Sequence, residues 1–233
     1  ATEEEHSQRA FSAAEAGIEQ VLKNNTSTSG SFTNNTSYTT TISTLEGQEF
    51  LMNNGTPILK DDATDLWLST YPTYATPWNG TLTVYWGSAS EQCTTSEQSD
   101  TLAALELILV TGDRNSPEVA QYALDPCSQR VNANQFEYIN AGGKTINGKA
   151  LRFRKTISVT SGLLMRIVPL YGEAVIGVTG CNGSGGNCNV FPAQGTVISS
   201  VGSVGEVQRK IVGFRENPKL PIQFFPFVLF SPK

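Results

Sequence analysis

The chain has 233 residues and a mass of 25.1 kDa, which is enough for one large β-rich domain or two small ones. Charged residues make up only 16% of the sequence, so its polar surface must come from uncharged Ser, Thr, Asn, Gln and Gly, as is typical of extracellular proteins. The formal net charge of -5 argues against nucleic-acid binding, and the single histidine, His6, argues against His-rich zinc sites and most acid–base catalysis. We therefore expect a protein that is not an enzyme, with no catalytic residues and no cofactor.

Residues 1–23 predict an amphipathic helix. No proline occurs from residue 7 to residue 23, and apolar side chains recur at spacings of three, four and seven. This stripe consists of Phe11, Ala14, Ile18, Val21 and Leu22. A stripe of this kind usually packs on a domain, and the small residues Ala14 and Gly17 permit close approach to a sheet or to another helix. We expect Phe11 to be exposed and Ile18 to Leu22 to be covered.

Residues 24–44 form a polar segment in which 17 of 21 residues are Ser, Thr or Asn. This composition is typical of a flexible connector, but it also fits a surface β-hairpin. The sequence leaves both interpretations open.

Residues 45–233 predict a β-rich head domain. Leu82, Val84 and Trp86 alternate with polar or aromatic neighbours, and Phe153, Ile157 and Val159 share one face of residues 149–160. Further apolar segments are separated by Gly and Pro; they are residues 102–110, 163–170, 174–178, 195–200, 206–214 and 225–230. One helix followed by many short strands predicts an α+β fold with a sandwich-like head.

The four cysteines have neither C-x-x-C spacing nor histidine partners, which favours disulfides over a zinc site. Four cysteines allow three pairings. We prefer Cys181 with Cys188, across a Gly-rich loop, and Cys93 with Cys127, because both loops are then local. Two disulfides would place folding outside the cytosol; buried free thiols are the alternative.

A group of three aspartates is a candidate metal site. Asp61, Asp62 and Asp65 offer oxygen ligands for calcium, but they lack the Asp-x-Asp-x-Asp-Gly loop, so a solvated loop or helix cap is the better interpretation.

An aromatic stretch also stands out, made of Trp67, Tyr71, Tyr74 and Trp78. It could form a sugar-stacking or adhesive surface, although packing in the core and in turns is the more common role of such residues.

The helix sequence Phe-Ser-Ala-Ala-Glu-Ala-Gly-Ile-Glu, which starts at Phe11, resembles the F-x-A-A-E-A-G-I-E segment of bacterial type IV pilin-like and minor-pilin proteins. Several later segments are similar to such proteins in their order along the chain. They are Trp86-Gly87, Asp125-Pro126-Cys127, residues 166–172 and residues 220–231.

The resemblance implies a pilin-like subunit that acts in filament assembly and surface attachment. Its partners would be other pilin subunits and host-cell or surface glycans, with helix contacts through Phe11, Ala14, Gly17, Ile18 and Leu22. The family's apolar half-helix, which anchors the subunit in the cytoplasmic membrane before assembly, would precede Ala1, and the mature protein would lie in an extracellular filament. The alternative is a secreted carbohydrate-binding or adhesin module with no filament role.

The C-terminal segment carries a dense apolar run between Phe224 and Phe230. Pro221, Pro226 and Pro232 lack amide donors, so they place the run at a sheet edge or divide it into short strands. We expect Phe225 to Phe230 to complete the sheet of the head.

Overall fold

The computed structural model describes residues 2–93, 101–140, 142–181 and 188–219. The chain forms two units, each described here by itself. The first consists of residues 1–45 and 193–217, and the second of residues 46–192 and 218–233. Residues 46–192 of the second unit are therefore inserted between two neighbouring strands of the first. The expected strand at Phe225 to Phe230 lies outside the described residues.

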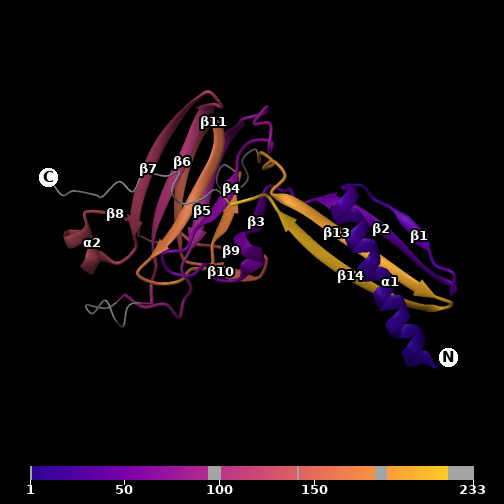
Figure 1. Ribbon diagram of the computed structural model, residues 1–233. Coiled ribbons are helices and arrows are strands. Elements are labelled where there is room, and N and C mark those ends of the chain that lie inside the picture. Colours follow the sequence, from indigo (N-terminus) through magenta and orange to yellow (C-terminus); the bar gives the residue numbers. More distant parts are fainter. Residues whose placement is uncertain (1, 94–100, 141, 182–187, 220–233) are drawn as a thin grey trace. The chain divides into compact units, whose positions relative to one another are not determined.

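The first unit is one helix on one antiparallel sheet. Helix α1 (Glu3–Asn24) begins at a capping box in which Thr2 and Glu5 exchange hydrogen bonds between side chain and backbone. The sheet order is β1 (Ser29–Ser31), β2 (Thr36–Thr44), β13 (Gly195–Val204) and β14 (Val207–Glu216). Figure 1 shows α1 running alongside this sheet. The Ser/Thr/Asn-rich segment is thus a β-hairpin, because β1 and β2 pair within it.

Close packing of α1 depends on small residues. The buried face of α1 consists of Ala10, Ala13, Ala14, Gly17 and Val21. A Cβ atom on Gly202 of β13 would lie only 1.9 Å from the Ala10 carbonyl oxygen, and one on Gly17 would lie 2.3 Å from the Ser200 hydroxyl. Backbone therefore packs almost directly on backbone, which is one of the two close approaches that the small residues of the helix permit.

The second unit is built around a large sheet. Its strand order is β3 (Glu49–Leu51), β12 (Gly177–Thr179), β5 (Trp78–Trp86), β11 (Phe153–Leu170), β6 (Ala104–Asp113), β7 (Ser116–Asp125) and β8 (Glu137–Tyr138), and β4 (Thr64–Trp67) also pairs with β11. The pairs are antiparallel except for β7 with β8. Smaller elements complete the unit; they are the 3-10 helix η1 (Met52–Gly55), helix α2 (Ser128–Asn134) and the hairpin of β9 (Lys144–Ile146) and β10 (Lys149–Leu151).

The strand predicted around Leu82, Val84 and Trp86 is present as part of β5, and these three residues are fully buried in the main core. Thr83 and Tyr85 between them are buried as well, so both faces of the strand are covered here. The two strands expected at residues 149–160 and 163–170 are largely one 18-residue strand, β11, with irregular register around Gly162. The protein is therefore α+β, with an N-terminal helix and a β-rich body that contains two disulfides, as the sequence predicted. No helix among the described residues is both long enough and apolar enough to cross a membrane.

Candidate functional site

Helix α1 presents apolar side chains on two faces. Ala14 and Gly17 are buried against the sheet, and Ile18 is half-buried. Phe11 is 47% exposed, as expected, but Leu22 is 51% exposed, so the prediction that the head would cover the helix as far as Leu22 is wrong. The reason is geometric: each residue turns about 100° around the helix, which carries Leu22 away from the face where Val21 is buried. We call Phe11, Ile18 and Leu22 the outer stripe.

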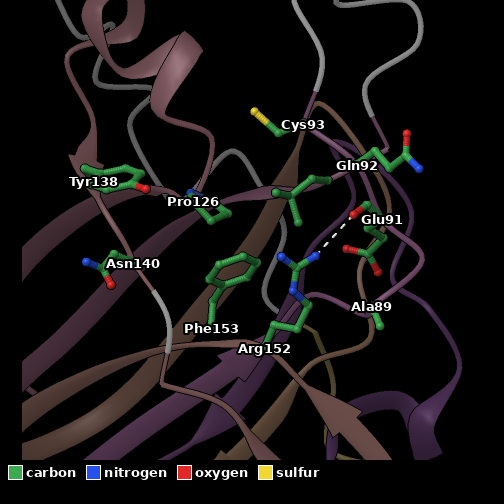
Figure 2. A pocket seen from close by; sticks show the side chains of 10 residues that line it. Ala89, Glu91, Gln92, Cys93, Pro126, Tyr138, Asn140, Arg152 and Phe153 are labelled. Carbon is green, nitrogen blue, oxygen red and sulfur yellow. Dashed lines mark hydrogen bonds between the residues drawn. The ribbon is translucent and has the colours of Figure 1, made fainter.

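A pocket of about 560 Å³ lies within the second unit. Its apolar floor consists of Leu102, Pro126 and Phe153, with Cys93 beside them. Figure 2 shows Tyr138 and Asn140 on one side of Phe153, and Arg152 and Glu91 on the other. The polar part of the lining consists of Glu91, Gln92, Tyr138, Asn140 and Arg152.

The pocket wall at Pro126 and Tyr138 is held by a buried ion pair. Both carboxylate oxygens of Asp125 accept hydrogen bonds from Arg130, at 2.7 and 3.0 Å, and Asp125 also accepts from the Cys127 amide and the Asn134 side chain. Arg130 additionally donates to the Leu102 carbonyl. Because Asp125 is fully buried, these bonds fix α2, the end of β7 and the cysteine of one disulfide in one arrangement.

The other wall is set by Arg152. Its backbone amide donates to the carbonyls of Trp86 and Gly87, while its guanidinium donates through Nη1 to the carbonyls of Ser88 and Glu91, both at 3.3 Å. The guanidinium also lies 4.9 Å from the centre of the Phe153 ring. No hydrogen bond from Nε or Nη2 of Arg152 is found among the described residues, so these donors can serve a ligand.

Burial raises the pKa of Glu91, and interactions with Ser88 and with the Arg152 guanidinium offset part of that rise. Its Oε2 atom is buried and accepts no hydrogen bond from the described residues. The pocket thus combines one guanidinium, one carboxyl group of raised pKa and two side-chain amides above an apolar floor.

The predicted aromatic stretch forms one cluster and one separate packing contact. Trp67, Tyr71 and Tyr74 are mutual neighbours, with ring centres 4.9 to 6.5 Å apart. Trp67 is buried, whereas Tyr71 is 37% exposed. Trp78 stacks on Phe191 in the core instead. Only part of the stretch therefore reaches the surface.

The three aspartates considered for calcium do not share one environment. Both oxygens of Asp65 accept hydrogen bonds from Arg166 at 2.8 Å, and both side chains are 2% exposed. Asp62 accepts from the Ala63 amide, while Asp61 has a positive φ of 62°. Within residues 2–93, 101–140, 142–181 and 188–219, no three acidic, His or Cys side chains form a group that could hold a metal ion.

Both predicted disulfides are present: Cys93 is bonded to Cys127, and Cys181 to Cys188. No cysteine is free. Two disulfides indicate folding in an oxidising compartment, extracellular or periplasmic.

Sequence reasoning did not identify the pocket. No binding role was assigned to Arg152, Tyr138 or Asn140 from the sequence. Two sequence features could have pointed to the pocket; they are the Asp125-Pro126-Cys127 motif and the Trp86-Gly87 pair before Cys93. The disulfide between Cys93 and Cys127 joins the two segments that contain them.

Comparison of the chain with protein-family models, with curated proteins and with solved structures found no match.

Proposed function

We propose that this protein is a non-enzymatic, pilin-like subunit of a type IV pilus or a related cell-surface filament, with roles in filament assembly and surface attachment. The observation that carries the proposal is the outer stripe. Phe11 and Leu22 are about half exposed although smaller residues of the same helix are buried. The resemblance of the sequence from Phe11 to Glu19 to the pilin helix motif supports the same role.

The physical argument is that α1 divides its apolar residues between two tasks. Ala10, Ala14 and Gly17 attach the helix to its own sheet at short range. Phe11 and Leu22 of the outer stripe gain less from that contact, because about half of each residue remains exposed to water. Packing against helices of neighbouring subunits would bury them, at roughly 25 cal/mol for each Å² of apolar surface removed from water.

In this role the partners are other pilin subunits, and the protein works in an extracellular filament. A membrane would be involved only before assembly, through the apolar half-helix that such proteins carry ahead of the segment described here. The two disulfides are compatible with this location.

The test is Phe11→Asp in the full-length protein expressed in its own host. We expect filaments to be lost, as judged by electron microscopy, while the thermal melting of the purified domain stays unchanged, because Phe11 is exposed in the isolated protein. The matched control is Leu59→Asp, which alters a 61% exposed apolar residue of the other unit and should leave filaments intact. Filaments that persist with Phe11→Asp would contradict the proposal.

The second candidate function is a secreted carbohydrate-binding or adhesin module with no filament role. The pocket between Tyr138 and Arg152 is the observation that favours it. Absence of the wild-type protein from purified filaments would favour this second candidate.

A further inference from the structure

The pocket has the size of a small-ligand site and an amphipathic lining. Its volume of about 560 Å³ lies within the usual range of about 300 to 1,000 Å³ for such sites. Phe153 and Leu102 are 6% and 3% exposed and form an apolar floor, while Tyr138 is 50% exposed at the rim. A ligand would therefore meet an apolar base and an accessible aromatic ring.

The polar groups narrow the chemical class of the ligand. A phosphate-rich ligand would need several cations, but among the described residues that line the pocket only Arg152 is cationic, and the carboxyl group of Glu91 lies close by. A lipid chain would need an apolar lining throughout, whereas Gln92, Asn140 and Arg152 present amide and guanidinium groups. The amides of Gln92 and Asn140 donate and accept hydrogen bonds and the guanidinium of Arg152 donates them, which suits the hydroxyl groups of a sugar.

The walls are also held in place before any ligand arrives. The disulfide between Cys93 and Cys127 joins two of the lining segments. Tyr138 belongs to β8, which pairs with the end of β7, and the following amide of Ile139 donates to the Asp125 carbonyl. A site with fixed walls loses little conformational entropy on binding, which favours affinity for a small, polar ligand.

We propose that this pocket binds a pyranose saccharide, with a ring face of the sugar on Tyr138 and its hydroxyl groups hydrogen-bonded to Arg152 and Asn140. The inference rests on the proposed role in surface attachment and supplies its chemistry. Nε and Nη2 of Arg152 are the donors left for this purpose, since Nη1 serves backbone carbonyls.

The experiment is saturation-transfer difference NMR on the purified protein, followed by calorimetry. The probes are galactose, mannose, N-acetylglucosamine and N-acetylneuraminic acid. We expect at least one sugar to bind, and we expect Tyr138→Leu and Asn140→Ala each to weaken that affinity about tenfold. Both side chains are exposed, so both variants should melt like the wild type.

Tyr71→Ala is the matched control, because it removes an exposed ring from the separate aromatic cluster of the same unit. We expect its sugar affinity to equal that of the wild type. No binding of any probe would overturn the proposal, as would affinity that survives both pocket substitutions or falls with Tyr71→Ala. The measurement needs no filaments, and Phe11→Asp should leave sugar binding unchanged, so a failure here is distinct from a failure of filament assembly.

Discussion

Gly202 allows the closest approach between α1 and its sheet, and Gly202→Ala tests that packing. The added Cβ would lie 1.9 Å from the Ala10 carbonyl oxygen and 2.6 Å from the Ala14 amide nitrogen. Both neighbours are backbone atoms of a helix, so neither can rotate away as a side chain could. Relief therefore requires the helix to move off the strand.

The size of the effect follows from that displacement. An ordinary carbon–oxygen contact is about 3.3 to 3.6 Å long, so the helix must retreat by roughly 1.5 Å at this point. A gap of that size removes much of the dispersion contact made by Ala10, Ala13, Ala14 and Gly17. We expect a loss of about 3 kcal/mol in the free energy of unfolding, at the upper end of the usual cost of overpacking.

The assay is thermal and urea unfolding of the first unit, followed by far-ultraviolet circular dichroism at the helix signal. For a domain of this size, a loss of about 3 kcal/mol corresponds to a Tm lower by about 12 to 24 °C. Gly213→Ala on β14 is the matched control, because a Cβ there meets nothing within 4 Å. That variant should be neutral or slightly more stable. Equal stability of the two variants would refute the close helix–sheet packing.

Three other substitutions test the second unit. Asp65→Ala removes the carboxylate that pairs with the buried Arg166 and should cost about 3 to 5 kcal/mol in urea unfolding. Glu137→Ala breaks the more exposed ion pair with Lys155 and should cost at most about 1 kcal/mol. Similar costs for the two variants would contradict the burial assigned to Asp65. Replacing Cys93 and Cys127 by Ser opens a loop of 34 residues and should lower the free energy of unfolding by about 3.8 kcal/mol. The same change at Cys181 and Cys188 opens a loop of seven residues and should cost about 2.4 kcal/mol. Calorimetry that reverses this order would refute the chain-entropy reasoning. Burial raises the pKa of Glu106, so on lowering the pH the folded state gains a proton before the unfolded state does, and stability should rise as the pH falls from the raised pKa toward the ordinary one. Glu106→Gln should stabilise the protein at pH 7 and flatten this rise. An unchanged pH profile of unfolding would contradict this reasoning.

The sequence predicted features that depend on local pattern. The helix follows from unbroken periodicity and from the absence of proline, and the presence of a strand at β5 follows from the alternation of Leu82, Val84 and Trp86 with their neighbours. Pairing of Cys181 with Cys188 could be inferred because a short Gly-rich loop separates them. Each of these inferences compares residues that are close along the chain.

Strand β7 and the small helix were not predicted, and β2 was only one of two interpretations of residues 24–44. β7 carries few strongly apolar residues in its first half, because its side chains there are exposed, so its pattern did not stand out. β2 is a run of Thr and Ser whose role became clear only through its pairing with β13. Helix α2 is too short for a periodic signal, and contacts of Arg130 with Asp125 hold it in place.

The sequence by itself determined the α+β class, the helix and the disulfide of the short Gly-rich loop, because propensity, periodicity and loop length act between near neighbours. Tertiary structure alone decided that β2 and β13 are adjacent across an inserted unit, that Val21 is buried while Leu22 is exposed, and that Tyr138, Arg152 and Phe153 line one pocket. These features join residues far apart in the chain or depend on which side of an element meets a partner. Long-range strand pairing and close backbone contact, as at Gly202, settle such questions, and no local pattern encodes them.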